Sequence, residues 1–206
     1  MTDASRAPGE AFEAAALEYL ETSARHLAAL VSPETAAAAA RAGHVLAEAL
    51  QGGGKVLFCG NGGSAADAQH LAAELVGRLS GDRDREPLAA ISLTTDASIL
   101  TALSNDYGYP DVFARQVMAL GRPGDALVAI STSGRSENVL RAARIAAEGG
   151  MRVVGLAGPD LSPLDDLVDI CLHAPGETSG LVQQGHITLG HLLCALAERA
   201  ILDEES

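Results

Sequence analysis

The sequence predicts an α/β fold in which a five-stranded parallel sheet is flanked by helices and preceded by two N-terminal helices. Five short apolar runs alternate with segments of helical spacing, which is typical of a parallel sheet covered by helices. Turns rich in glycine or serine follow two of these runs, where open α/β sheets bind ligands. The 206 residues, 48% of them hydrophobic, are expected to form one domain with a sizeable core.

The chain opens with two helical segments. Residues 10–30 and 34–51 are rich in alanine and leucine, and Ser32-Pro33-Glu34 is a typical helix start between them. We therefore expect two antiparallel helices. The predicted domain covers residues 1–206, with the helical pair at 1–51 and an α/β core at 52–206.

The core contains the expected strands and their covering helices. The apolar runs that predict strands are residues 56–59, 88–93, 127–130, 153–156 and 170–172. Helical patterns fall near residues 64–79, 96–104, 111–120, 136–149, 162–167 and 178–202. Strand and helix alternate along the whole core, so each strand is expected to run parallel to its neighbours.

The charge and the N-terminal pattern exclude several classes of partner. The net charge of -13 and the pI near 4.7 disfavour nucleic acid and anionic membranes as partners. The N-terminus lacks a signal-peptide pattern, and no apolar run approaches the ~18 residues of a membrane span, so a cytoplasmic location is expected. The three cysteines lie in apolar patterns, which favours reduced, buried thiols over disulfides.

The first candidate site is the glycine-rich turn after the first strand. Residues 60–64 read Gly-Asn-Gly-Gly-Ser and lead into a helix, so bare backbone N–H groups and the helix dipole can attract an anion there. On that helix His70 and Glu74 lie four residues apart and share one face. The turn also matches G-x-G-x-x-A through Gly60, Gly62 and Ala65, which leaves a nicotinamide or flavin nucleotide as an alternative ligand.

The second candidate site is a hydroxyl-rich turn after the third strand. It contains Ser131, Thr132, Ser133 and Ser136 and leads into the helix that begins near Glu137. An ordinary helix N-cap needs only one such side chain. Four hydroxyls at a helix N-terminus favour a phosphate-binding loop over plain capping.

The closing helix carries further polar groups: Gln183, Gln184, His186 and His191. Two imidazoles, a carboxylate and an amide oxygen could hold a divalent metal such as zinc, or Glu74 and His191 could transfer protons directly. Gln183 and His191 diverge by ~80° and lie about 12 Å apart along the helix, whereas Gln184 is better aligned with His191. Only a partner that approaches between the two turns would let Gln183 and His191 share one metal.

Four segments of the chain resemble the sedoheptulose 7-phosphate isomerases, members of the sugar isomerase (SIS) superfamily. They read GNGGSAADAQHLAAELVGR, ALSNDYGYPDVFARQV, AISTSGRSENVLRAA and QQGHITLGHLL, and the resemblance covers about residues 10–200. It implies a flavodoxin- or Rossmann-like SIS sandwich that converts a sugar phosphate. It also implies a homotetramer with sites at subunit interfaces, where the 1–51 pair packs on the core or on the tetramer interface.

The resemblance also implies roles for individual residues. Glu74 and His191 correspond to the acid/base pair, and a zinc ion is implied on His70, Glu74, Gln183 and His191. Residues that match substrate-binding positions are Asn61, Gly62, Gly63, Ser64, Arg78, Asn105, Asp106, Ser131, Thr132, Ser133, Ser136 and Gln183. The expected reaction interconverts D-sedoheptulose 7-phosphate and D-glycero-D-manno-heptose 7-phosphate through an enediol.

One departure keeps other functions open. Family members commonly carry an acidic residue in a D-R-I-Q pattern before the glutamine, whereas this chain reads Gly180-Leu181-Val182-Gln183. The alternatives are an isomerase for a different sugar phosphate and a non-catalytic tetramer that binds a protein partner, as does the paralogue that associates with the DnaA initiator. A nucleotide-dependent oxidoreductase is the third alternative.

Overall fold

The sheet has the predicted five parallel strands. The computed structural model describes residues 8–79 and 85–204, and its strands are β1 (Val56–Gly60), β2 (Ala90–Ser92), β3 (Ala126–Ser131), β4 (Arg152–Ala157) and β5 (Ile170–His173). Their order is β2-β1-β3-β4-β5, and every pair is parallel. The connection after β1 leads to one edge of the sheet, and the connection after β3 leads toward the other edge. The carboxyl ends of these two neighbouring strands therefore form the topological switch point, where open α/β sheets bind ligands.

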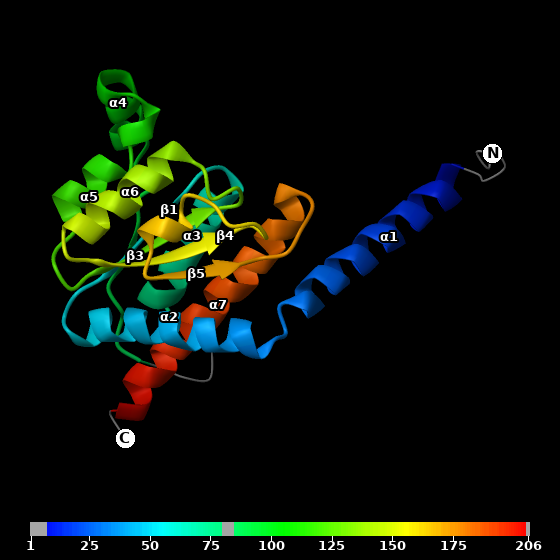
Figure 1. The fold of residues 1–206 in the computed structure, drawn as a ribbon, viewed down its shortest axis with the longest axis horizontal. Coiled ribbons are helices and arrows are strands. Elements are labelled where there is room, and N and C mark those ends of the chain that lie inside the picture. Colours follow the sequence, from blue (N-terminus) through cyan, green and yellow to red (C-terminus); the bar gives the residue numbers. More distant parts are fainter. Residues whose placement is uncertain (1–7, 80–84, 205–206) are drawn as a thin grey trace.

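Helices cover both faces of the sheet (Figure 1). Helices α2 (Pro33–Gln51), α3 (Gly63–Val76) and α7 (Ser179–Glu204) bury one apolar cluster, which includes Phe58 and Leu71. Helices α5 (Ala114–Leu120) and α6 (Glu137–Glu148) bury a second cluster on the other face, which includes Phe113. Because β1, β3 and β4 are covered on both sides, they read as continuous apolar runs in the sequence.

The two N-terminal helices do not form the antiparallel pair that we expected. Figure 1 shows α1 (Pro8–Ala29) leaving the body as a projecting arm that continues beyond the end of α2 rather than folding back along it. Only Leu30 to Ser32 separate the helices, and the Ser32 hydroxyl caps α2 by accepting from the Thr35 N–H at 3.0 Å. Helical spacing therefore predicted both helices correctly, but not how they are arranged relative to one another.

Several predicted helices differ from those in the structure, among them the segment 111–120, where the helix α5 begins only at Ala114. The segment 162–167 forms only a 3₁₀ turn, η2 (Asp165–Leu167), because Pro163 interrupts it and the Asp165 carboxylate accepts from the Ser162 N–H at 2.8 Å. Helix α3 ends at Val76 instead of residue 79, since Gly77 follows with non-helical backbone angles. Helix α4 (Ala97–Tyr107) and a second 3₁₀ turn, η1 (Tyr109–Asp111), complete the fold.

Helix α4 projects from the body in Figure 1 and buries none of its own residues. Its Asp96 caps the N-terminus by accepting from the Ile99 N–H at 2.9 Å. Among the described residues, none of the helices combines the length and the apolarity that crossing a bilayer requires.

Candidate active site

Both predicted loops lie at the switch point. β1 and β3 are neighbours, with Gly60 opposite Ile130, so the turn 60–64 and the serine loop (residues 131–136) begin side by side. Gly62 adopts φ 56°, a left-handed conformation that favours glycine, and this lets the chain enter α3 directly. The N-termini of α3 and α6 therefore lie next to one another, which concentrates N–H groups suited to a phosphate.

Asn61 is held by two residues that the sequence patterns did not single out. Its amide exchanges two hydrogen bonds with the amide of Asn138, each at 2.8 Å, and its Oδ1 also accepts from the Tyr109 hydroxyl at 2.8 Å. Asn138 is 3% exposed. The Asn61 side chain therefore locks the first loop to α6 and η1. No short-range pattern connects these residues, which lie 77 and 48 positions apart.

The serine loop is not a simple helix cap. Ser136 occupies the N-cap position of α6, yet its side chain makes no capping hydrogen bond. Instead the buried Ser131 donates its hydroxyl to the Ser136 oxygen at 3.0 Å, and the Ser133 oxygen accepts from the Arg135 N–H at 3.2 Å. With Thr132, these hydroxyls line the N-terminal end of α6, an arrangement that can bind phosphate oxygens.

His70, Glu74 and His191 form one cluster. Nε2 of His70 lies 2.7 Å from Nε2 of His191 and 3.3 Å from Oε1 of Glu74, and the two rings meet edge to face. His70 and Glu74 are 49% and 20% exposed, so solvent or substrate can reach the cluster. The i,i+4 spacing on α3 and the parallel packing of α7 bring these groups together.

The donor set of the cluster fits a divalent metal. One ligand atom from each of the three residues lies within 4.8 Å of the others. The two facing Nε2 atoms share at most one hydrogen between them, and ligands on a tetrahedral zinc lie about 3.4 Å apart when metal–nitrogen distances are about 2.1 Å. Asp67, one turn before His70, has a buried Oδ2 with no hydrogen-bond partner among the described residues. Burial raises the pKa of this carboxyl, and the charge of His70 partly offsets the effect.

Gln183 lies away from this cluster within the chain. A Cβ at Gly63 would overlap the Gln183 amide, so this side chain packs on the first turn of α3 beside the 60–64 loop. His70 and His191 meet about two turns further along, because α3 and α7 run in the same direction and eight helical residues rise about 12 Å. The structure thus brings together three of the four predicted metal ligands, and it places the fourth at the loop end of the site.

The remaining predicted residues are distributed around the two loops. Ser64 is buried in the first turn of α3, against Gly60. Arg78 is exposed and lies beyond the end of α3, so it does not share the helix face of His70 and Glu74 as the longer predicted helix implied. Asn105 donates to Asp106 at 2.8 Å on the projecting α4.

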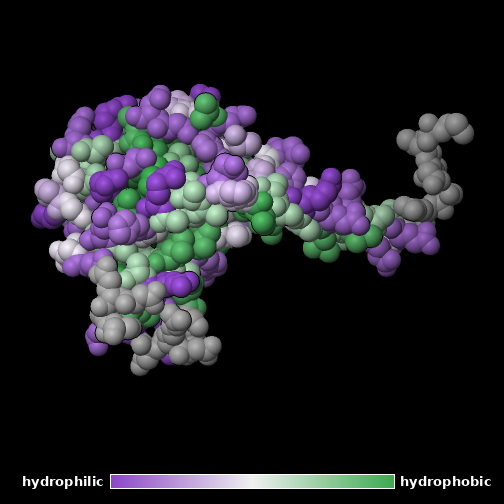
Figure 2. Space-filling model, turned by 60° about the horizontal axis from the view of Figure 1, so that its bottom comes forward, coloured by the Kyte–Doolittle hydropathy of each residue, from purple (hydrophilic) through white to green (hydrophobic). Residues whose placement is uncertain are grey.

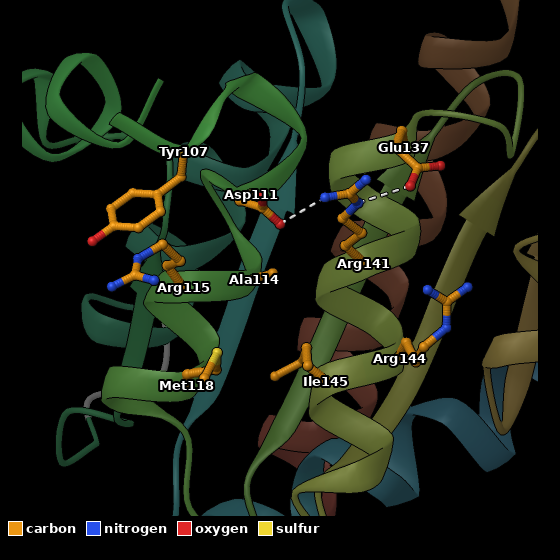
Figure 3. Close-up of a pocket in the computed structure, with 9 residues that line it drawn as sticks. All are labelled: Tyr107, Asp111, Ala114, Arg115, Met118, Glu137, Arg141, Arg144 and Ile145. Atoms are coloured by element: carbon orange, nitrogen blue, oxygen red, sulfur yellow. Dashed lines mark hydrogen bonds and ion pairs between the residues drawn. The ribbon is translucent and has the colours of Figure 1, made fainter. Parts of the chain in front are cut away.

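A cavity of about 440 Å³ lies outside these loops, in a groove between α5 and α6 (Figure 3). Arg141 crosses one side of it and is held between Asp111 at 2.9 Å and Glu137 at 2.8 Å. Arg115 stacks over the ring of Tyr107, 3.7 Å from its centre. Arg144 lines the groove as well. The ion pair between Arg141 and Asp111 joins η1, which carries Tyr109, to α6, which carries Asn138.

The flavodoxin-like strand order and the serine loop at its switch point define the class of this protein, the SIS domain. A family model of the SIS domain matches residues 18–158. The chain is 52% identical over 168 residues to a phosphoheptose isomerase from Rhodospirillum rubrum, covering 82% of this chain and 88% of that protein. It is 51% identical over 174 residues to one from Geotalea daltonii, covering 84% and 88%.

Solved structures agree with these relatives. Phosphoheptose isomerase GmhA from Neisseria gonorrhoeae is similar with a TM-score of 0.79 and 40% identity, covering 94% of this chain and 100% of that one. The enzyme of the same name from Francisella tularensis gives a TM-score of 0.81 at 37% identity, covering 88% and 95%. The chain therefore belongs to the phosphoheptose isomerase family of SIS-domain proteins, and it is a sugar-phosphate isomerase.

Proposed function

We propose that this chain converts D-sedoheptulose 7-phosphate to D-glycero-D-manno-heptose 7-phosphate. The observation that carries the proposal is the His70, Glu74 and His191 cluster, which lies on the two helices that border the loops at the switch point. Relatives with about 50% sequence identity to this chain are named phosphoheptose isomerases, which supports the choice of substrate.

In this proposal Glu74 and His191 move the protons. Glu74 removes a proton from C1 of the open-chain ketose, the electron pair forms the C1=C2 bond of an enediol, and the C2 oxygen takes a proton from His191. Return of a proton to C2 and loss of the O1 proton complete the aldose, so no oxidant or reductant is consumed. General acid–base catalysis of this kind contributes about 10²- to 10⁴-fold to the rate.

His70, Glu74 and His191 would hold a zinc ion, with Gln183 as the proposed fourth ligand. When bound, such an ion polarises a carbonyl and stabilises the negative charge that develops on its oxygen. Gln183 reaches the ion only if its side chain turns from Gly63 toward His191, or if a neighbouring subunit completes the site.

The loops at the switch point would hold the substrate. The hydroxyls of Ser131, Thr132, Ser133 and Ser136 bind the phosphate, and residues 61–64 border the sugar, with Arg78, Asn105 and Asp106 as further contacts. Phosphate binding at a distance from the reacting carbons fixes their position and so contributes to the rate. His70 lies seven residues, about 10 Å, along α3 from Gly63, a span comparable with an extended seven-carbon chain.

We further propose that residues 1–206 fold as one SIS domain that assembles into a homotetramer with sites at subunit interfaces. Figure 2 shows hydrophobic residues along the projecting α1 arm. Phe12, Leu20 and Val31 are 77%, 64% and 87% exposed, which is unusual for a chain that acts alone. A second subunit that covers α1 and α4 would bury these surfaces and bring Asn105 and Asp106 to a neighbour's loops. Sedimentation of the purified chain tests the assembly.

A cytoplasmic location is part of the same proposal. Cys59, Cys171 and Cys194 are free thiols, which fits a reducing compartment. Microscopy of the tagged chain in the bacterial cell tests the location.

Two alternatives are separated from this function by one experiment. The purified, zinc-loaded chain is incubated with sedoheptulose 7-phosphate and, in parallel, with shorter ketose phosphates, and the products are followed by NMR. We expect an aldose from the seven-carbon substrate. Turnover of a shorter substrate alone would indicate a different sugar-phosphate isomerase, whereas no turnover of any would favour the partner-binding tetramer. The departure at Gly180 and Leu181 is the sequence feature from which both alternatives arise.

A further inference from the structure

A second loop supports the serine loop from behind. After β4 the chain turns through residues 158–164 and packs on the serine loop, with the Leu164 N–H donating to the Gly134 oxygen at 3.2 Å. A Cβ at Gly134 would overlap the side chain of Ser162, and a Cβ at Gly158 would overlap the Thr132 carbonyl oxygen. The two loops touch through their backbones, so a shift of residues 158–164 displaces the serine loop as well.

His173, at the end of β5, joins the start of this supporting loop to Asp165, the residue that directly follows it. Its Nδ1 lies 2.7 Å from the Gly158 oxygen, and its Nε2 lies 2.8 Å from Oδ1 of Asp165. The other carboxylate oxygen of Asp165 accepts from the N–H and the hydroxyl of Ser162, at 2.8 and 2.9 Å. A continuous set of contacts thus runs from His173 through Asp165 and Ser162 to Gly134.

Both ring nitrogens of His173 face oxygen atoms that can only accept, a carbonyl oxygen and a carboxylate oxygen. Burial raises the pKa of Asp165, but the Ser162 hydrogen bonds and the His173 charge outweigh it and leave the pKa lowered, so the acceptor is a carboxylate. Both ring nitrogens are therefore occupied, which disfavours a metal on His173, Asp165 and Cys171 although their ligand atoms lie within 4.8 Å of one another.

The other groups around His173 do not replace this pairing. Cys171, on the same strand, has a thiol pKa raised to about 12 by burial and by Asp165, so it stays neutral. His186, on α7, has its pKa lowered first by burial and also by the charge of His173, and its Nε2 donates to Ala157 at 2.9 Å. Glu34, on α2, lines the small cavity outside the ring.

We propose that His173 is a positioning residue that holds the phosphate-binding shape of the serine loop through its contacts with Gly158 and Asp165. Loss of the imidazole ring releases both Gly158 and Asp165. The affinity for the phosphate group then falls, while proton transfer at Glu74 and His191 is spared. The inference rests on the proposed function only in taking the serine loop as the phosphate site.

The test compares His173→Gln with the wild-type chain and with His44→Gln. His44 is an exposed histidine on α2 that pairs with Glu48, which makes it a matched control. KM and kcat for sedoheptulose 7-phosphate are measured for all three chains at one pH.

We expect His173→Gln to raise KM about five- to tenfold, because the glutamine side chain cannot keep both contacts of the ring and the serine loop loses part of its support. The value of kcat should change less than twofold. An unchanged KM, or a loss confined to kcat, overturns the proposal. Unfolding curves establish that each variant is folded.

A second measurement separates this inference from the function. Calorimetry with inorganic phosphate reports on the serine loop without turnover, so a wild-type chain that binds phosphate but forms no aldose contradicts the function alone. Asp165→Asn should weaken phosphate binding as His173→Gln does, and the double variant should be no weaker than either single one. Independent, additive losses would show that the two residues do not act through one contact.

Discussion

Arg85 and Glu198 join the C-terminal end of α3 to α7, and we expect their separation to destabilise the protein strongly. Their side chains are 3% and 7% exposed, and Nε lies 2.7 Å from Oε2. Arg85 also donates to the backbone oxygens of Glu74 at 3.0 Å and Leu75 at 2.9 Å, so it binds the last turn of α3. The pair therefore fixes the helix that carries Glu74 against the helix that carries His191.

Glu198→Leu removes the carboxylate and leaves Arg85 as a buried charge without its ionic partner. Such a change costs about 3–5 kcal/mol, a large part of the roughly 5–15 kcal/mol that stabilises a typical domain. Adding Arg85→Met removes the buried charge as well, and we expect the double variant to recover about 2 kcal/mol. The recovery is incomplete because the carbonyl oxygens of Glu74 and Leu75 both lose the Arg85 donor, although that of Leu75 keeps a second one, the Leu88 N–H at 3.1 Å.

Urea unfolding at one fixed protein concentration measures these differences. Glu137→Leu serves as a control, because Glu137 pairs with Arg141 at 2.8 Å on the surface and exposed pairs contribute little. A loss below about 1 kcal/mol in Glu198→Leu, or a double variant no more stable than the single one, would refute the reasoning.

Three further predictions concern the loop, the metal and acid stability. Gly134→Ala should weaken the binding of inorganic phosphate and lower stability, since φ of Gly134 is 61° and the new methyl group overlaps Ser162. The control Gly53→Ala, where φ is 77° and the methyl group enters open space, should lower stability alone. Equal phosphate affinities of the two variants would contradict this. Dialysis against a chelator should abolish aldose formation and zinc should restore it; full activity of the chelated chain would contradict the metal site. Burial lowers the folded-state pKa of His186, so the free energy of unfolding should decrease as the pH falls below the unfolded-state pKa of about 6.5. In urea unfolding, His186→Leu should make the free energy of unfolding depend less on pH in this range. An unchanged pH dependence would refute the prediction.

Most of the sheet could be predicted from the sequence because its strands are buried on both faces. Val56, Leu127 and Val153 begin uninterrupted apolar runs, and each run became a strand with ends within two residues of those expected. The two loops could be found for a related reason, since glycines or clustered hydroxyls directly after a parallel strand lie at the sheet edge where ligands bind.

Long-range packing set the limit of prediction. The contacts of Asn61 with Asn138 and Tyr109 join segments far apart in the chain, and nothing in their local patterns connects them. The helical spacing of residues 10–30 predicted a helix, but not that apolar side chains of α1 such as Phe12 and Leu20 would lie exposed. His173 directly follows the apolar run 170–172 and belonged to no pattern that indicates a role, and the segment with which it pairs was predicted to be a helix.

The central claim is that Glu74 transfers the proton between C1 and C2, and a matched pair of variants tests it most directly. His44 and Glu48 on α2 have the same i,i+4 spacing as His70 and Glu74, and both nitrogen–oxygen distances are 3.3 Å. The measurement is kcat for aldose formation from sedoheptulose 7-phosphate by Glu74→Gln and Glu48→Gln, each zinc-loaded and shown to be folded. We predict a loss of at least about a hundredfold in Glu74→Gln and none in Glu48→Gln. Wild-type turnover in Glu74→Gln would contradict the account.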